Sequence, residues 1–192
     1  MMTLGPVDRL RRSRCKDLAY FSPCGPITVP AATAKKKVSM ISFNLVVHMV
    51  SAVVWVGGMF FAFMALRPVA AVQLESPQRL RLWAGVFQRF FPWVWLAVLA
   101  LPTSGVWLAR RFFGAVFASP IHVHIMLVIG IAMVVIFLHV FFAPYRRLRQ
   151  ALTASDWPAG GRALASIRRL VALNLFLGLT VVAVAAGGRV SV

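Results

Sequence analysis

Residues 121–143 read IHVHIMLVIGIAMVVIFLHVFFA, an apolar run whose only ionisable side chains are three histidines. At about 1.5 Å per residue, a helix of this length crosses a hydrocarbon core about 30 Å thick. Backbone N–H and C=O groups find no water in that layer, and a helix pairs them within the segment. Because nothing alternates with a period of two, a membrane β-barrel is excluded. The run therefore predicts a transmembrane helix.

Three further apolar blocks of similar length cover residues 43–66, 90–109 and 170–188. The first contains His48, and the other two contain no ionisable side chain. The chain is 60% hydrophobic and 13% charged, whereas a soluble domain is about half apolar and about a quarter charged. We therefore predict an all-α bundle of four transmembrane helices, formed by residues 40–192.

The formal net charge of +17 is carried by lysines and arginines that all lie outside the four blocks. In a soluble protein this charge would suggest nucleic acid as a partner, but here we expect loops that contact anionic lipid headgroups. The four acidic residues also lie outside the blocks, which argues against a carboxylate proton relay in the membrane. These residues are Asp8, Asp17, Glu75 and Asp156.

Residues 1–39 differ in composition from the rest and contain all four lysines of the protein. They are rich in proline and show no amphipathic period, so they are predicted to be a disordered basic tail. Cys15 and Cys24 lie in this tail and are too isolated to form a zinc site. Met40 begins a sequence typical of a natural N-terminus, and our hypothesis is that translation starts there.

Orientation depends on that tail. With it, the two sides of the membrane carry 11 and 10 positive residues, whereas from Met40 onward they carry 3 and 10. The second distribution follows the positive-inside rule. It places both termini outside and the loops 67–89 and 144–169 in the cytoplasm.

Proline dipeptides suggest where these elements begin and end. Arg67-Pro68 is predicted to end the first helix, and Ser76-Pro77 to begin a short helix in the membrane interface. Pro102 is predicted to kink the second span, which a membrane helix tolerates.

The histidines place ionisable groups inside the spans, where such groups default to a functional hypothesis. His48 is the sixth residue of the first span and His124 the fourth of the third. Successive spans cross the membrane in opposite directions, so the first and third spans run the same way. We therefore expect the two histidines to lie at similar depth in the membrane. Facing each other, two imidazoles would hold a haem iron axially, or a copper ion. Ser51, one turn from His48, would orient its ring.

The other two histidines are weaker metal-ligand candidates. His122 is the second residue of its span, where an interfacial role is the simpler reading. His139 lies about 22 Å along the helix from His124, so the two cannot share a ligand sphere. A structural hydrogen bond, with Asn174 at comparable depth, is the simpler reading for His139.

Methionine thioethers suit Cu(I). Met59 lies on the same face as His48, and Met126 and Met133 lie on one stripe with His122. Met59 and Met126 are therefore weaker copper candidates, although packing is the usual role of such methionines. Trp55-Val-Gly57-Gly58 in the first span allows close approach of a neighbouring helix or a flat cofactor.

The segment from His48 through Trp55 and Gly57-Gly58 to Arg67-Pro68 resembles the opening helix of the CopD-like (copper resistance D) membrane family. The resemblance extends over roughly residues 41–189 and includes Arg89-Phe-Phe-Pro-Trp-Val-Trp95, Ser104-Gly105 and Phe141-Phe-Ala-Pro-Tyr-Arg-Arg-Leu-Arg149. It implies a bacterial inner-membrane protein for copper uptake or handling, with a periplasmic copper-binding protein as partner. A homo-oligomer stays an open alternative.

The chain more distantly resembles the HemJ-type protoporphyrinogen oxidases, four-helix proteins associated with haem b. His48 matches their first-helix histidine, whereas His124 stands about where they have a lysine, which argues against that oxidase activity. Motifs for phosphate binding, nucleophilic catalysis, metalloproteases and covalent haem are absent, and no catalytic residue is predicted. Copper handling is thus the leading function; a haem b oxidoreductase and a structural subunit without a cofactor are the alternatives.

Overall fold

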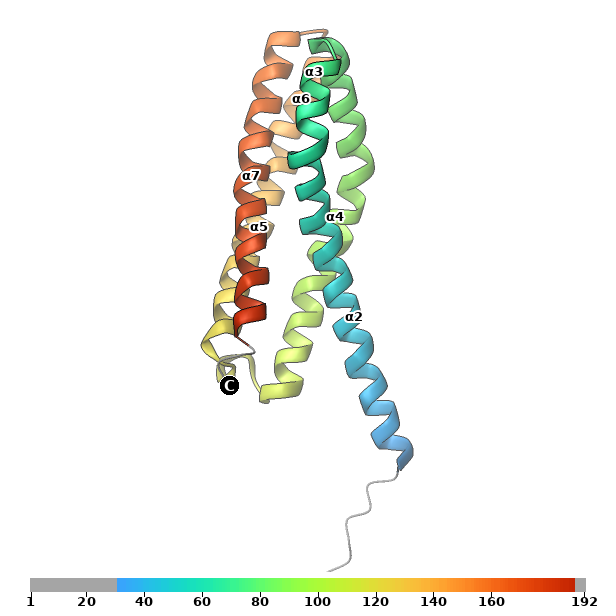
Figure 1. The fold of residues 1–192 in the computed structure, drawn as a ribbon, viewed down its shortest axis with the longest axis vertical. Coiled ribbons are helices and arrows are strands. Elements are labelled where there is room, and N and C mark those ends of the chain that lie inside the picture. Colours follow the sequence, from blue (N-terminus) through green and yellow to red (C-terminus); the bar gives the residue numbers. More distant parts are fainter. Residues whose placement is uncertain (1–30, 189–192) are drawn as a thin grey trace, which may run out of the picture. The chain divides into compact units, whose positions relative to one another are not determined.

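A computed structural model describes residues 31–188 of the chain, with side chains from Ser39 onward. Within this range the chain is helical apart from short connections, and four helical segments are long and apolar enough to cross a membrane (Figure 1). The predicted all-α bundle with four spans is therefore confirmed. The candidate spans are Ser39–Gln73, Ser76–Phe113, Ile121–Thr153 and Trp157–Gly187, each longer than its apolar block.

The first span consists of α2 (Ala31–Phe61), a π-helical turn η1 (Ala62–Leu66) and α3 (Arg67–Gln73). The predicted end at Arg67-Pro68 is wrong. Proline removes one backbone donor and crowds the preceding turn of an α-helix. The wider π-turn directly before it accommodates the ring, so the helix continues for another two turns.

Part of the predicted tail is helical, because α2 begins at Ala31. Residues 1–30, which include both cysteines, lie outside the described residues. The proposed start at Met40 stays a hypothesis.

The second span is a single helix, α4 (Ser76–Phe113). The predicted separate interfacial helix is wrong, because its apolar side chains continue the buried stripe of the span. Side chains three or four positions apart share one helix face, and this face packs into the bundle. Its buried members include Leu80, Trp83, Phe87, Phe91 and Val94.

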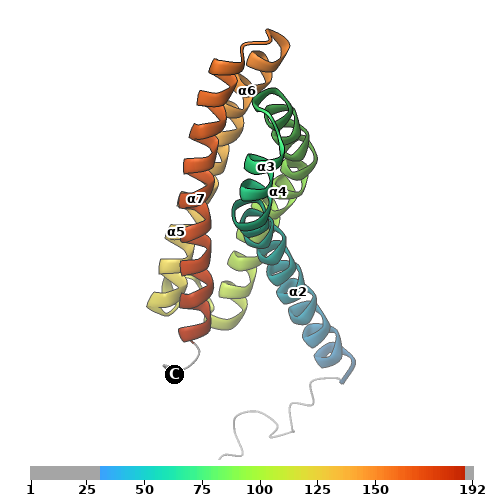
Figure 2. The same ribbon diagram turned by 45° about the horizontal axis from the view of Figure 1, so that its top comes forward.

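The second half of the chain forms a 3₁₀ turn η2 (Val116–Ala118), then α5 (Ile121–Phe142), α6 (Pro144–Thr153) and α7 (Trp157–Gly187). Figures 1 and 2 both show α5 and α6 running alongside α7. Pro144 begins α6, which follows α5 after a break at Ala143. The Asp156 carboxylate accepts a 2.9 Å hydrogen bond from the Ala159 N–H and caps α7.

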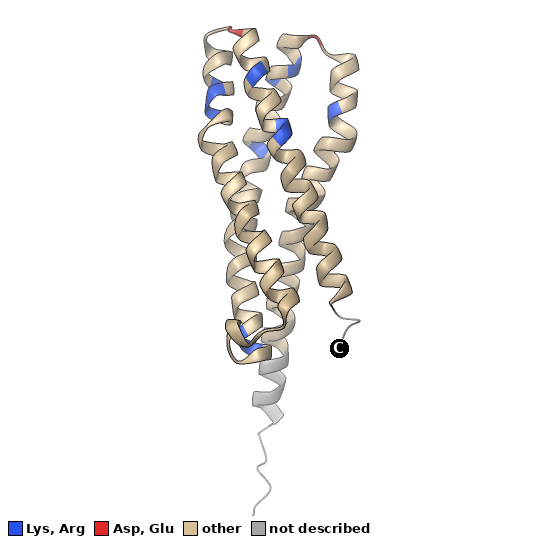
Figure 3. Cartoon of the chain, turned by 90° about the vertical axis from the view of Figure 1, so that its left-hand side faces the viewer, with Lys and Arg blue, Asp and Glu red and all other residues tan. Residues whose placement is uncertain are grey.

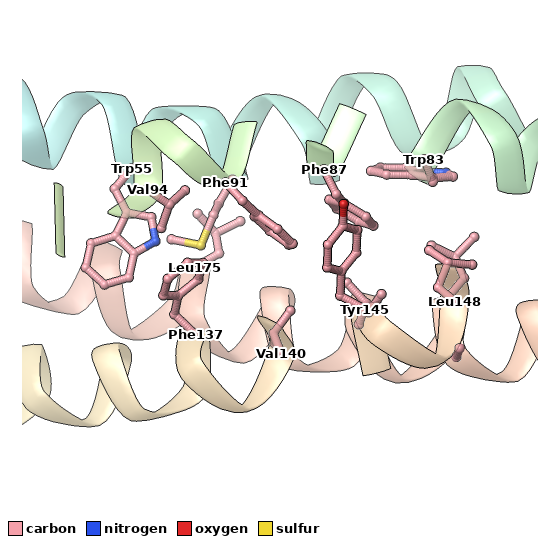
Figure 4. Packing of buried hydrophobic residues seen from close by; sticks show 14 of the residues in the cluster. Trp55, Trp83, Phe87, Phe91, Val94, Phe137, Val140, Tyr145, Leu148 and Leu175 are labelled. Carbon is pink, nitrogen blue, oxygen red and sulfur yellow. The ribbon is translucent and has the colours of Figure 1, made fainter. Parts of the chain in front are cut away.

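The core combines aliphatic side chains with a series of aromatic rings that contact one another (Figure 4). The Phe91 ring of α4 packs edge-on against Tyr145 of α6, with 4.8 Å between ring centroids. Leu148 of α6 and Ile167 of α7 are completely buried. Residues 144–169, predicted as a cytoplasmic loop, therefore form part of the packed core.

Glycines mark the closest helix contacts, as small residues do in membrane bundles. A Cβ atom on Gly178 of α7 would lie 2.9 Å from Val56 of α2 and 3.2 Å from Met133 of α5. A Cβ atom on Gly58 would collide with the Phe90 ring of α4, whereas one on Gly57 would meet nothing within 4 Å. Of the Gly57-Gly58 pair, Gly58 is therefore the position that allows close approach.

We expect Gly178→Leu to lower the free energy of unfolding in detergent by roughly 1–3 kcal/mol, the usual cost of overpacking a core. Val56 is β-branched and cannot readily rotate away. Thermal unfolding of the purified protein measures the effect.

Gly57→Leu is the matched control, since Gly57 is exposed on the bundle surface. Equal stability of the two variants would contradict the described packing of α2 and α5 around Gly178.

Candidate functional site

His48 of α2 faces α4. Its Nδ1 lies 2.9 Å from Ser104 Oγ, and a Cβ atom on Gly105 would lie 3.2 Å from its Cε1. The absence of a side chain at Gly105 thus gives the imidazole room against α4. Ser104, not Ser51 of its own helix, is the hydroxyl that positions the ring.

The hydrogen bonds of Ser104 determine which imidazole nitrogen is free. Ser104 Oγ donates to the carbonyl of Ala100 in its own helix. A hydroxyl has one proton, so Oγ accepts from the N–H at Nδ1 of a neutral His48. The lone pair then lies on Nε2. An imidazole whose other nitrogen donates to a fixed partner is the usual arrangement of a metal-binding histidine.

His124 is held differently. Its Nδ1 lies 3.3 Å from the carbonyl oxygen of Pro120, one turn earlier in the chain. It lies about two and a half helical turns before the buried Met133, and so on the opposite face of α5. Five full helical turns separate His124 from Phe142, so the two side chains lie on the same face of α5. Phe142 is 53% exposed, and this face therefore points outward.

The structure therefore does not bring His48 and His124 together. One binds a side chain of α4, and the other binds the first turn of its own helix on an outward face. This geometry does not fit a haem iron with these two histidines as axial ligands. His139 also lies on the outward face of α5 and is exposed.

Asn174, expected at the depth of His139, lies inside the bundle with Met59. Asn174 is 3% exposed and Met59 is 4% exposed. The Asn174 amide Nδ2 donates to Met59 Sδ at 3.6 Å. Asn174 Oδ1 has no hydrogen-bond partner among the described residues. A buried acceptor without a partner is costly and unusual.

The stripe of His122, Met126 and Met133 on α5 faces α7. A Cβ atom on Gly188 would lie 2.8 Å from the His122 ring, and one on Gly178 would lie 3.2 Å from Met133 Cε. Met126 is half-buried between them. Gly178, which Met133 contacts, lies one turn after Asn174 on α7. The Met133 end of the stripe is therefore the end nearer to Asn174 and its partner Met59.

All four spans line one cavity of about 320 Å³ beside Met59 and Asn174. Its walls are otherwise apolar and contain six aromatic side chains, and Ala62 and Leu66 of the π-turn contribute to them. π-turns occur frequently at functional sites in helices. The lining includes Trp55, Phe61, Met59, Phe87, Phe90, Phe91, Phe137 and Asn174.

Sequence reasoning missed Ser104 as the partner of His48 and Asn174 as a buried polar group of the site. The Ser104-Gly105 step was a usable signal for Ser104, because it places a hydroxyl beside a small residue just after the kink expected at Pro102. For Asn174 the signal was stronger, since it is an amide inside an otherwise apolar span.

A double-mutant cycle tests the His48–Ser104 hydrogen bond. We expect His48→Phe and Ser104→Ala to show a coupling free energy of about 0.5–1.5 kcal/mol in thermal unfolding, the net value of one such bond. His48→Phe with Ser51→Ala is the matched control and should show none. Coupling to Ser51 and not to Ser104 would contradict the geometry.

Comparison with known proteins adds one finding. The model of the family described as Copper resistance protein D matches residues 84–187. The match covers α7 and α5 completely but leaves out His48 and Met59 of α2. No curated protein and no solved structure matches significantly, and the HemJ-type resemblance receives no support. The chain, a multi-pass helical membrane protein, belongs to the CopD (copper resistance protein D) family.

Proposed function

We propose that this protein carries copper as Cu(I) across the bacterial cytoplasmic membrane. The observation that carries the proposal is the inward position of the soft donors. The stripe of His122, Met126 and Met133 on α5 faces α7. Met59 of α2 lies buried against Asn174 of α7. Thioethers select Cu(I) over harder cations.

The charges of the described spans support this choice of ion. The two acidic residues in this part of the chain, Glu75 and Asp156, lie at the helix connections and not in the bundle interior. Hard divalent cations require several oxygen ligands, commonly carboxylates. A monovalent, soft ion is the better match to an interior that offers thioethers and imidazoles.

His48 is a further proposed ligand, on the side of α2 that faces α4. Its Nδ1 is held by Ser104, and Nε2 keeps the lone pair that a metal requires. His124 and His139 lie on the outward face of α5 and have no part in the proposed path.

Copper uptake into proteoliposomes tests the function. Vesicles with the wild-type protein should accumulate radioactive Cu(I) faster than empty vesicles. Met59→Leu combined with Met133→Leu should lower the initial rate at least about tenfold, since losing one ligand worth about 1.4 kcal/mol has that effect. Leucine keeps the volume of methionine, so the fold should tolerate both changes.

Met49→Leu combined with Met64→Leu is the matched control. These methionines are 47% and 57% exposed on α2 and η1 and should contribute nothing to the path. Equal rates in the two double variants, or no uptake above that of empty vesicles, would refute the proposed path.

The arginines support an orientation. Figure 3 shows most of the basic residues at the end of the bundle that holds the α3–α4 and α6–α7 connections. Ten arginines lie within residues 67–89 and 146–169, whereas only Arg110 and Arg111 lie toward the other end of the described bundle. By the positive-inside rule, we place the ten-arginine end in the cytoplasm.

Cysteine labelling tests this orientation. In a background with Cys15→Ser and Cys24→Ser, Phe117→Cys should react with a membrane-impermeant maleimide on intact spheroplasts, because Phe117 is 93% exposed in η2. Ala154→Cys, exposed in the α6–α7 connection, should react only after lysis. The reverse pattern would invert the topology.

A further inference from the structure

The cavity beside Asn174 contains a buried acceptor, the Asn174 side-chain oxygen, that lacks a hydrogen-bond donor among the described residues. Asn174 lines the cavity, is 3% exposed, and its Oδ1 has no partner among the described residues. Its Nδ2 is already directed to Met59 Sδ. An acceptor buried in this way destabilises the folded protein unless something in the cavity donates to it.

The walls limit what that donor can be. Every lining residue other than Asn174 is apolar or aromatic, and none carries a charge. A charged organic ligand would lose its hydration without compensation, whereas Cu(I) differs because the Met59 thioether can bind it. A lipid acyl chain would fill the space but could not donate to Oδ1. The occupant is therefore neutral and largely apolar, with a hydroxyl or N–H group.

The rings in the wall favour a planar occupant. Trp55, Phe87, Phe90, Phe91 and Phe137 line the cavity from three helices, and aromatic rings pack well edge-on or offset against another ring. A volume of about 320 Å³ lies at the small end of ligand sites, which run from about 300 to 1,000 Å³.

The cavity also reaches the lipid-facing side of the bundle. Phe61 belongs to its lining and is 61% exposed. A ligand dissolved in the hydrocarbon layer could therefore approach it without crossing water.

We infer that this cavity binds the aromatic head group of a hydroquinone, with one ring hydroxyl donating to Asn174 Oδ1. A quinol is neutral, planar and soluble in the membrane, and it has the donor that a lipid chain lacks. This binding goes beyond the proposed copper transport. It depends on Asn174 and the aromatic walls, whereas the copper path depends on the methionine and histidine donors.

Thermal unfolding of the full-length protein in detergent tests the inference. The probes are duroquinol, kept reduced with ascorbate, and 1,4-dimethoxytetramethylbenzene, which has the same ring but no donor. We expect duroquinol to raise the unfolding temperature, because a ligand of the folded state stabilises it. The apparent affinity for the dimethyl ether should be about tenfold weaker, the effect of one lost buried hydrogen bond.

Asn174→Leu should abolish this preference for duroquinol, so that both probes act equally. Thr180→Val is the matched control. It removes another polar group of α7, one whose hydroxyl bonds to the carbonyl of Phe176 in its own helix, and it should keep the preference.

Equal effects of the two probes on the wild-type protein, or no effect of either, would overturn the inference without any need for a variant. A preference that survives Asn174→Leu would overturn it as well. These outcomes are separate from the uptake assay. If vesicles take up copper and their protein does not bind duroquinol, the copper proposal stands and the quinol inference fails.

Discussion

Water is absent from the hydrocarbon core of a bilayer, so each polar group that enters it must find a partner within the protein. The backbone meets this constraint by forming helices, and short polar side chains meet it by bonding to their own helix. Thr103, Ser104 and Thr180 each donate to a carbonyl about one turn earlier. Two side-chain hydrogen bonds in the described part of the chain instead join different helices. They are His48 with Ser104, and Asn174 with Met59.

These two contacts hold α2 to the rest of the bundle at different depths. The His48 ring lies over Gly105 of α4, and Val56 lies over Gly178 of α7. Between them, Trp55 packs edge-on against Phe137 of α5 at 6.2 Å. The tightest packing lies further along, where α4, α6 and α7 bury Leu148, Leu164 and Ile167. The cavity thus lies where the loosely held first span meets a well-packed frame formed by the other three. We regard this as the physical reason that residues of all four spans line one cavity.

The sequence predicted the number and kind of spans because apolar length is a strong signal in membrane proteins. It misplaced the end of the first span, because Pro68 read as a stop. In the structure, Pro77 and Pro144 begin helices, and a π-turn accommodates Pro68. The arginine-rich segments read as loops for a related reason. Their charges hide the narrow stripe of Leu80, Tyr145 and Leu148 that packs into the core.

The candidate site was partly predictable. Depth along a helix follows from residue number, and this suggested that His48 and His124 are level. The direction of a side chain around the helix axis depends on which neighbour the helix packs against, and this cannot be read from depth. His124 turned out to share the face of Phe142, whereas Met133 faces inward. The buried amide of Asn174 was visible in the sequence as a polar residue in an apolar block, but only the packing of α2 against α7 shows that its partner is Met59.

The central claim is that the interior of this CopD-family bundle offers thioether sulfur to Cu(I). X-ray absorption at the copper edge, on purified full-length protein loaded with Cu(I), tests it most directly. We predict a shell that contains sulfur and imidazole nitrogen, and weaker sulfur scattering in the variant with Met59→Leu and Met133→Leu. A shell of nitrogen and oxygen alone in the wild-type protein, or copper that is removed by a simple desalting step, would contradict the account.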